Sequence, residues 1–423
     1  MDLLRFITCG SVDDGKSTLI GRLLYDSDAV SLDVLAALEE QNRTSAAGTV
    51  DLALLTDGLR AEREQGITID VAHKYFTTAR RKFIITDTPG HVQYTRNMVT
   101  GASNADLAIV LVDARQGVVE QTRRHTLVAA LLGIRRFVLA VNKIDLVGYS
   151  EAVFRDVVAD YAAVADQLGI RQVVSIPISA LHGDNVVGAS ARLPWYQGPS
   201  LLEHLETVPV AAEASTDAGR FQVQYVIRPQ TPELPDYRGY AGRIQSGVYR
   251  RGDKVVVLPA GIETTLEAIE INQQEVAVAV APQAVVLRLA DDVDVSRGDT
   301  IAPAAQAPEP THELEATLCW MAEQPLRAGR KLLVQHHAAK TKAVVQAIVA
   351  KTDIQSLAQL DTTEARLNDI VRVRLKTAVP LAADTYQQNR TTGAFILLDE
   401  QTGATLAAGL IEQTALVEPE FEI

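Results

Sequence analysis

The hydrophobic positions follow two different patterns along the chain, and the change falls near residue 207. Before it, apolar runs of strand length (Phe83–Thr86, Leu107–Val112 and Phe137–Val141) alternate with helical patterns at Gln121–Leu132 and Ala152–Leu168. Strands that alternate with helices indicate a mostly parallel sheet covered by helices. The pattern therefore predicts an α/β domain over residues 1–207.

The second pattern consists of short alternating strands separated by turn signals. A stretch with the composition of a linker, 208–219, precedes it, and a Pro- and Ala-rich break at Ala302–Pro310 divides it into residues 220–308 and 309–423. The first series predicts a small β-barrel, and the second predicts another all-β region. The expected strands are Phe221–Arg228, Arg238–Ser246, Lys254–Leu258, Glu263–Ile271, Val285–Leu289, Glu313–Cys319, Lys331–His336, Lys342–Val349, Asp369–Leu375 and Ala394–Asp399.

A phosphate-binding loop follows the first apolar run. Residues Gly10–Ser17 match the pattern G-x-x-x-x-G-K-[ST] between the strand-like Leu3–Cys9 and the helix-like Thr18–Leu24. The glycines let successive N–H groups point into one concavity, and the helix N-terminus adds its positive dipole end. A glycine-containing turn with a surface lysine is the alternative, which the complete match in this context disfavours. The expected nucleotide contacts are Gly10, Ser11, Val12, Asp13, Asp14, Gly15, Lys16, Ser17 and Thr18, with Lys16 on the β- and γ-phosphates and the Ser17 hydroxyl on Mg²⁺.

Two further segments suit the γ-phosphate and its metal ion. Asp87–His91 follows the strand-like Lys82–Thr86, so that Asp87 can hold Mg²⁺, usually through water, and the Gly90 N–H can reach the γ-phosphate. In Arg63–Asp70, the Thr68 hydroxyl can take a second Mg²⁺ position. Taken singly, these segments would be a Pro-Gly turn and a charged loop. Together with the phosphate loop they predict catalytic roles for Thr68 and for His91, whose side chain follows Gly90 and can orient the attacking water.

Two further segments suit recognition of the nucleotide base. After the strand-like Arg136–Val141 come Asn142, Lys143 and Asp145, and one carboxylate at Asp145 can accept from both N1–H and the 2-amino group of guanine. Adenine lacks those donors and would leave the carboxylate unpaired, which costs ~1–3 kcal/mol or more. The second segment is Ser179, Ala180 and Leu181, where a backbone N–H can serve the guanine carbonyl. The chain is therefore expected to bind GTP.

These motifs carry a family resemblance. Glu62–Asp70, Asp87–His91 and Asn97–Met98 resemble the translational-factor class of GTPases, which includes elongation factor Tu. A closer likeness is to the large, GTPase subunits of bacterial sulfate adenylyltransferases (ATP sulfurylases), where Ser-Val-Asp-Asp stands in the phosphate loop in place of the histidines that flank Val-Asp in elongation factor Tu. It rests on Thr8–Asp26, Thr56–Gly66, Asp113–Val118, Gln121–His125 and Pro194–Pro199.

The resemblance implies two β-barrels behind the GTPase domain. It also implies a smaller catalytic partner subunit that makes adenylylsulfate and pyrophosphate from ATP and sulfate, with GTP hydrolysis driving that uphill reaction. Asp13 is expected to help hold a monovalent cation, by likeness to the translational class. Some family members carry a fused adenylylsulfate kinase domain, which needs its own phosphate loop, and no second such pattern follows residue 200.

Two other functions stay open at this point: a factor of the elongation-factor type that delivers aminoacyl-tRNA, and a regulatory GTPase without coupled chemistry. The net charge of −13 argues weakly against nucleic-acid binding, which normally needs a basic face. The concentration of basic residues from Arg327 to Lys351 is expected to be a solvated face, with a partner-binding patch as the alternative.

The remaining composition indicates a cytoplasmic protein with no membrane contact. No stretch approaches the roughly 18 uncharged apolar residues of a membrane span, and no basic region precedes an apolar run at the start. Two cysteines, Cys9 and Cys319, cannot make a disulfide framework, and Cys9 is expected to be a small core residue. For His336 and His337, one side chain in and one out on a strand is favoured over a zinc site.

Overall fold

The computed structural model describes residues 2–27, 29–30, 52, 72–90, 95–210, 218–229, 231–232 and 236–414, without the side chains of 95 and 96. Thr68 and His91 lie outside these ranges. The chain divides into two compact units, Met1–Val210 with Asp353–Ala358, and Ala211–Thr352 with Gln359–Ile423. None of the helices in the described part of the chain is both long and apolar enough to cross a membrane.

The first unit is built on a six-stranded sheet of order β2-β3-β1-β4-β5-β6. Only the edge strand β2 runs antiparallel to its neighbour. Its strands are β1 (Leu3–Cys9), β2 (Ala72–Thr77), β3 (Lys82–Asp87), β4 (Leu107–Asp113), β5 (Arg136–Asn142) and β6 (Gln172–Pro177), and its helices are α1 (Lys16–Asp26), α4 (Thr95–Ala102), α5 (Glu120–Leu131), α6 (Glu151–Gln167), α7 (Leu201–Thr207) and the 3₁₀ turn η3 (Ile144–Val147). The predicted α/β fold is confirmed.

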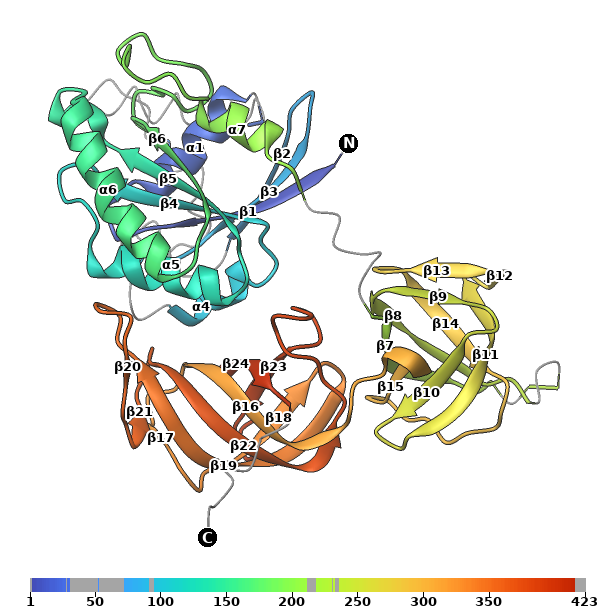
Figure 1. The fold of residues 1–423 in the computed structure, drawn as a ribbon. Helices are drawn as coiled ribbons and strands as arrows, with labels where there is room; N and C mark the ends of the chain where they lie inside the picture. The colour runs from blue at the N-terminus through green and yellow to red at the C-terminus, as the bar shows by residue number, and fades with distance from the viewer. Residues whose placement is uncertain are drawn as a thin grey trace. The chain divides into compact units, whose positions relative to one another are not determined.

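Helices cover both faces of this sheet (Figure 1). On one face, Leu19 and Leu23 of α1 and Leu201 and Leu205 of α7 share a core with the strands. On the other lie α4, α5 and α6. Since water reaches neither face, the central strands can be apolar throughout, and all seven residues of β4 are buried. Cys9 is fully buried at the end of β1, as predicted.

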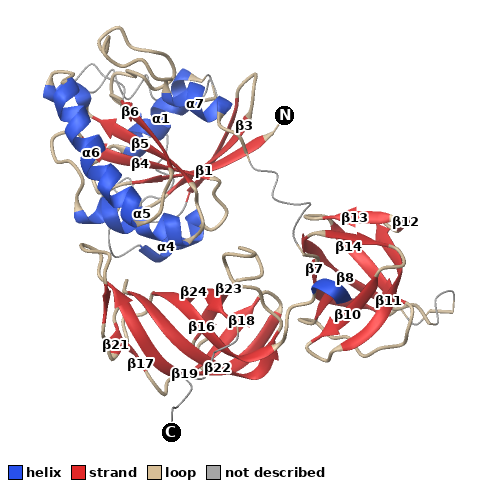
Figure 2. Cartoon of the chain, viewed as in Figure 1, coloured by secondary structure: helices blue, strands red, loops and turns tan. Residues whose placement is uncertain are grey.

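The second unit contains two six-stranded β-barrels, each with one further strand at its edge (Figure 2). The β10–β11 pairing closes the first, and the β18–β19 pairing closes the second. The strands are β7 (Arg220–Ile227), β8 (Gly239–Ser246), β9 (Val248–Arg250), β10 (Lys254–Leu258), β11 (Ile262–Ile271), β12 (Gln274–Val276), β13 (Val278–Val280), β14 (Ala284–Leu289), β15 (Thr300–Pro303), β16 (Thr311–Trp320), β17 (Leu326–Arg327), β18 (Lys331–His336), β19 (Ala339–Thr352), β20 (Gln359–Leu360), β21 (Glu364–Ala365), β22 (Ile370–Leu381), β23 (Ala394–Leu398) and β24 (Thr405–Gln413), and η4 (Ala304–Gln306) is a 3₁₀ turn.

Two barrel strands differ from the sequence pattern. β15 occupies the first residues of the predicted break at Ala302–Pro310, because β10 and β7 pair with it from both sides. β24 was not predicted, since its Ala- and Gly-rich sequence has a low strand propensity. Its Gly409 lies against the ring of Phe395, where a Cβ would collide with the ring carbons. Packing against β23 therefore requires a glycine at position 409, and glycine lowers the strand propensity of the sequence.

Candidate nucleotide-binding site

The motif residues that the structure describes gather at one edge of the sheet. Each follows the carboxyl end of a strand: the phosphate loop follows β1, Asp87 ends β3, Asn142 ends β5 and Ser179 lies just beyond β6. The parallel register sets Thr8 beside Asp87 and Asp113 beside Asn142. Open α/β sheets bind ligands at this edge.

The phosphate loop has a backbone that only glycine accepts at two points. Gly10 and Gly15 have φ of 151° and 92°. A Cβ on Gly10 would lie 2.8 Å from the Leu111 carbonyl oxygen, and one on Gly15 would lie 2.5 Å from Nδ2 of Asn142. The loop therefore needs both glycines to pass so close to β4 and β5.

The Lys16 side chain is hydrogen-bonded to the backbone of the phosphate loop. Its Nζ donates to the carbonyl oxygens of Gly10 at 3.1 Å and Ser11 at 2.7 Å. Burial lowers the pKa of Lys16, whereas the nearby carboxylates of Asp87 and Asp14 act in the opposite direction. The ammonium is thus fixed at the phosphate end of the site.

Asp13 and Asp14 point to different environments. The Asp14 carboxylate is buried and accepts from the Ser11 N–H at 2.5 Å, which fixes the entry of the loop. Burial raises the pKa of Asp14, and the hydrogen bond from Ser11 opposes that rise. Asp13 is exposed at a φ of 67°. Asp13 is therefore the one of the two that solvent ions can reach.

The segment after β3 lies against the phosphate loop. The Thr8 hydroxyl donates to Oδ1 of Asp87 at 3.0 Å, which aims that carboxylate. A Cβ on Gly90 would lie 2.6 Å from Nζ of Lys16 and 3.0 Å from the backbone N of Val12. Gly90 therefore lies close against Lys16 and the phosphate loop. This placement is compatible with the predicted γ-phosphate contact of its N–H, which stays a prediction.

The donor set at this end fits Mg²⁺. Ser17 stands on the first turn of α1 and offers a hydroxyl oxygen, and Asp87 offers a carboxylate. Mg²⁺ usually takes one or two such protein oxygens and completes its octahedron with water and phosphate oxygens. Among the described residues no group of three or more His, Cys, Asp and Glu side chains comes together as a metal cage. The hydroxyl of Ser17 and the carboxylate of Asp87 are the described oxygen donors for such an ion.

Asn142 joins the phosphate end to the base end. Its Nδ2 donates to the Asp14 carbonyl oxygen at 2.7 Å, and its Oδ1 accepts from the Ala180 N–H at 2.9 Å. One buried side chain thus ties the loop after β1 to the loop after β6. Asp145, in η3, keeps its carboxylate only 12% exposed, with Nε2 of His182 at 3.8 Å.

Arg22 supports the 179–181 loop from α1. Its guanidinium donates to the carbonyl oxygens of Ala180 at 3.2 Å and Leu181 at 2.5 Å. The Ser179 N–H donates to the Asp184 carbonyl oxygen at 3.2 Å, and the Leu181 side chain stays exposed. The Ser179 N–H is therefore already used, which leaves the Leu181 N–H as the better donor for a guanine carbonyl.

Sequence reasoning missed His125 on α5. This side chain is fully buried, and its Nδ1 accepts from the Gly10 N–H at 3.1 Å. Burial lowers the pKa of His125 to about 3, so the ring is neutral, and because Nδ1 accepts from Gly10 its proton lies on Nε2. The Gln121 side-chain amide lies against Nε2 and must present its oxygen to accept that proton. The signal in the sequence was two polar residues at i and i+4 on a helix that must face the sheet.

A second missed group lies between β4 and β5. Asp113 ends β4 with its carboxylate completely buried, and it pairs with Lys143 and Arg115. Burial alone would raise the pKa of Asp113, but hydrogen bonds from Arg115 and Lys143 hold it well below its usual range. The carboxylate is therefore ionised beside the predicted base contacts.

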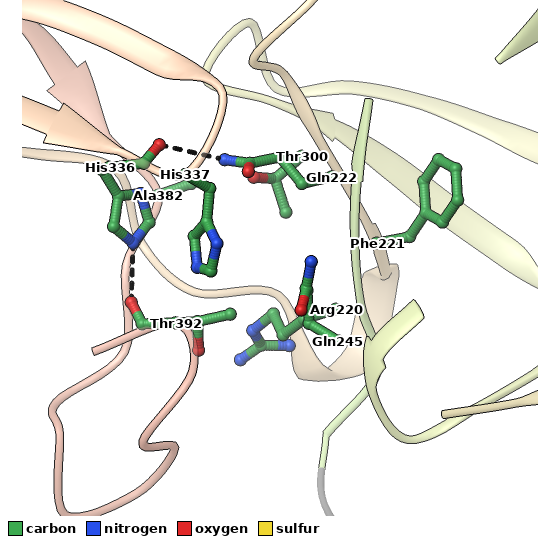
Figure 3. Close-up of a pocket in the computed structure, with 9 residues that line it drawn as sticks. All are labelled: Arg220, Phe221, Gln222, Gln245, Thr300, His336, His337, Ala382 and Thr392. Carbon is green, nitrogen blue, oxygen red and sulfur yellow. Dashed lines mark hydrogen bonds between the residues drawn. The ribbon is translucent and has the colours of Figure 1, made fainter. Parts of the chain in front are cut away.

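In the second unit, a small polar pocket lies where the two barrels meet (Figure 3). Arg220 of β7 donates to both carboxylate oxygens of Asp384, at 2.9 and 2.7 Å. His336 is buried with its Nε2 2.7 Å from the Thr392 carbonyl oxygen, and His337 is half-buried at a φ of 51°. The expected inward and outward pair is wrong, because the chain turns after β18 and directs both rings into the pocket.

The basic residues on the second barrel are mostly exposed, as expected, and they form surface ion pairs. On this barrel Arg327, Lys342 and Lys351 each contact an acidic partner, at 2.8, 2.6 and 2.7 Å. Those partners are Glu364, Glu400 and Asp369. Glu364 lies on β21, whereas Glu400 and Asp369 lie in turns next to strands, and together they offset part of the local positive charge.

Comparison with known proteins covers the whole chain. Residues 1–218 match the elongation factor Tu GTP binding domain family, and residues 313–412 match the GTP-eEF1A C-terminal domain-like family. The bifunctional enzyme CysN/CysC of Mycobacterium tuberculosis is 55% identical over 411 residues, which cover 97% of this chain and 67% of that protein. Two proteins named sulfate adenylyltransferase subunit 1 are also similar. That of Aeromonas hydrophila is 50% identical, and the match covers 97% of this chain and 86% of that protein. That of Cellvibrio japonicus is 48% identical, with coverages of 100% and 90%.

These relatives support the sulfate adenylyltransferase prediction over the elongation-factor alternative. The GTP-binding domain is of the elongation factor Tu type, yet the likeness to the sulfate adenylyltransferase subunits extends through both barrels. The chain therefore belongs to the sulfate adenylyltransferase subunit 1 family of GTP-binding proteins.

Proposed function

We propose that this chain is the GTP-hydrolysing subunit of a cytoplasmic sulfate adenylyltransferase. A smaller partner subunit joins sulfate to the α-phosphorus of ATP and releases pyrophosphate. The resulting phosphosulfate anhydride is high in energy, so the reaction runs uphill. Hydrolysis of GTP on this chain supplies the driving force through a conformational change.

The observation that carries the proposal is the double hydrogen bond of Asn142. It holds the phosphate loop and the 179–181 loop at a fixed spacing, through contacts of 2.7 and 2.9 Å. A nucleotide that reaches both loops must present its phosphates at one end and its base at the other. We propose phosphate contacts from Gly10, Ser11, Val12, Asp13, Asp14, Gly15, Lys16, Ser17, Thr18 and Gly90. We propose guanine contacts from Asn142, Lys143, Asp145 and the loop of Ser179, Ala180 and Leu181, in which the Leu181 N–H is the donor for the guanine carbonyl, because other groups already take the Ser179 and Ala180 N–H.

Ser17, Asp87 and Thr68 are the proposed oxygen donors for Mg²⁺. When bound, such an ion would supply positive charge that offsets the charge of the phosphates during hydrolysis. The exposed carboxylate of Asp13 is the proposed contact for a monovalent cation near the same phosphates. If so, GTP hydrolysis should be slower when a large organic cation replaces potassium in the buffer.

The chemical step needs a positioned water molecule. Water adds to the γ-phosphorus, the bond to the β–γ bridging oxygen breaks, and GDP and phosphate are formed. The transition state is loose, so the work of the protein is to orient the water and stabilise charge. His91 is the proposed orienting group, and the segments around Thr68 and after Gly90 are the proposed switch elements.

The proposed domains are 1–207, 220–308 and 309–423.

The test combines the two reactions. Wild-type protein and the His91→Ala variant are mixed with the partner subunit, ATP and sulfate, and adenylylsulfate is measured together with single-turnover GTP hydrolysis. We expect the variant to bind GTP almost normally and to hydrolyse it ~10²–10⁴-fold more slowly, as for other positioned proton-handling side chains. Adenylylsulfate formation should fall with it.

The matched control is His204→Ala on α7, which removes a half-buried histidine away from the sheet edge. It should leave both rates near those of the wild type. If wild-type adenylylsulfate formation were the same with GTP, with GDP and without nucleotide, the coupling proposal would be wrong. A His91→Ala rate within about threefold of the wild type would leave the coupling intact and remove His91 from the mechanism.

A further inference from the structure

We infer that Asp113 is a positioning residue for guanine recognition, because it binds the Lys143 ammonium and so keeps that cation away from the Asp145 carboxylate. This inference rests on the proposed nucleotide site. It adds to that site an acid on β4 that makes no contact of its own with the base.

The fold brings Asp113 to Lys143 across two neighbouring strands. β4 and β5 run in parallel with Asp113 opposite Asn142, and the Ala114 N–H donates to the Asn142 carbonyl oxygen at 2.9 Å. Lys143 follows directly with a φ of 59°, a left-handed conformation that turns the chain sharply after the strand. The Lys143 ammonium then reaches Oδ2 of Asp113 at 3.0 Å.

Arg115 completes this cluster. Its backbone N–H and Nε donate to Oδ1 of Asp113 at 2.9 and 3.0 Å, and Nη2 contacts Oδ2 at 2.6 Å. Both carboxylate oxygens are therefore engaged, while the Arg115 side chain itself stays 48% exposed. The carboxylate is held in one orientation by the arginine and offers the lysine a fixed partner.

Charge explains why this matters for the base. Asp145 has to accept two hydrogen bonds from guanine, and Lys143 is a flexible cation only two residues away in sequence. An ammonium released from Asp113 would find Asp145 as a nearby carboxylate and would compete with the base for it. A fully buried ionised acid such as Asp113 is costly unless it is paired, so the pair with Lys143 is favoured strongly.

A purely structural role is the alternative, in which the cluster only ties the ends of β4 and β5 together. The two roles differ in whether the effect of Asp113 on nucleotide affinity depends on Lys143. A structural tie would affect the whole site whatever stands at position 143. A positioning role acts through the Lys143 ammonium and requires that cation to be present.

The test is a double-mutant cycle read out as affinity for fluorescent GDP and for a fluorescent non-hydrolysable GTP analogue. We expect Asp113→Asn to weaken both affinities about 10-fold, the size of a lost hydrogen bond to a charged group. Single-turnover hydrolysis of saturating GTP should change less than twofold, because the phosphate end is untouched. In a Lys143→Met background, Asp113→Asn should change the affinities less than twofold.

A second variant covers the case in which Asp113→Asn does not fold. Arg115→Ala removes the two side-chain contacts from the exposed side, and it should weaken affinity about threefold only while Lys143 is present. Equal losses in the wild-type and Lys143→Met backgrounds, or a fall in the hydrolysis rate of bound GTP, would overturn the inference. Failure of the wild type to bind GTP would instead refute the proposed function, which separates the two.

Discussion

Asp145 is the residue at which base choice can be tested directly. Its carboxylate can accept from N1–H and the 2-amino group of guanine, whereas an amide at the same place can donate to the 2-carbonyl of xanthine. Asp145→Asn should therefore lose GTP affinity by at least 10-fold and gain affinity for xanthosine triphosphate. Equilibrium titration with both nucleotides is the measurement.

The control at this scale is Asp166→Asn, an acid on α6 away from the sheet edge. It should leave both dissociation constants unchanged. Unaltered GTP and xanthosine triphosphate affinities in Asp145→Asn would refute the guanine assignment for this residue.

At the residue scale, sequence reasoning found the groups that belong to local motifs and missed those that act through space. Asn142 and Lys16 stand in local sequence motifs, so they could be identified as site residues from the chain alone. His125 reaches Gly10 from 115 residues away, and Asp113 meets Lys143 through the strand register. The partner that each of them meets cannot be read from the sequence, because it depends on which strands are adjacent.

At the scale of elements, Asn142 connects the loops after β1, β5 and β6. Asn142→Ala removes two buried hydrogen bonds and leaves the Asp14 carbonyl and the Ala180 N–H without this partner. Each loss costs ~1–3 kcal/mol, so the two together cost ~2–6 kcal/mol, and we expect affinity for GTP and GDP to fall at least about 30-fold. Competition binding of both nucleotides measures this.

The loss should be similar for the two nucleotides, since Asn142 fixes the spacing of the loops rather than the γ-phosphate. A variant that weakened GTP alone would contradict this role. Asn185→Ala is a suitable comparison, because its amide donates to the Pro177 carbonyl oxygen at 3.0 Å on the far side of the same loop. It should destabilise the loop with a smaller effect on affinity.

The strands were predictable where apolar runs follow clear turn signals, and unpredictable where packing decides. Lys254–Leu258 and Lys331–His336 have the predicted limits, because each contains an apolar run shortly after a glycine of positive φ, Gly252 or Gly329. Thr300–Pro303 and Thr405–Gln413 are strands through the neighbours that pair with them. Their small residues fit beside bulky partners, and this complementarity becomes visible only when the barrel is closed.

At the scale of the whole molecule, the join between the two barrels should be sensitive to acid. Burial lowers the pKa of His336 and lowers that of His337 from 6.5 to about 4, in a pocket that also holds Arg220 and Asp384. The unfolded chain binds these protons below about pH 6.5 and the folded chain does not, so stability is complete above that pH and falls as the pH drops. For His337 alone, linkage gives a loss of about 2 kcal/mol between pH 7 and pH 5.

The variant His337→Asn tests this sign, because asparagine tolerates the left-handed backbone at this position. The urea midpoint of the barrels should drop less between pH 7 and pH 5 in the variant than in the wild type. An equal drop in both would show that His337 is not the titrating group. Gln335→Asn, one residue before the histidine pair on β18, is the matched control and should keep the wild-type pH dependence.

The charge of the whole chain bears on the delivery of aminoacyl-tRNA, the activity of the translational factors that share this domain order. Binding to RNA draws much of its affinity from Lys and Arg contacts to phosphates. Here the net charge is −13, and Arg327, Lys342 and Lys351 on the second barrel already contact acidic side chains. We therefore expect no specific complex with aminoacyl-tRNA. Filter binding in the GTP state at physiological salt is the measurement, with elongation factor Tu as the positive control. A nanomolar complex that weakens steeply with salt would mean that a basic surface forms in the GTP state, and it would restore the delivery-factor alternative.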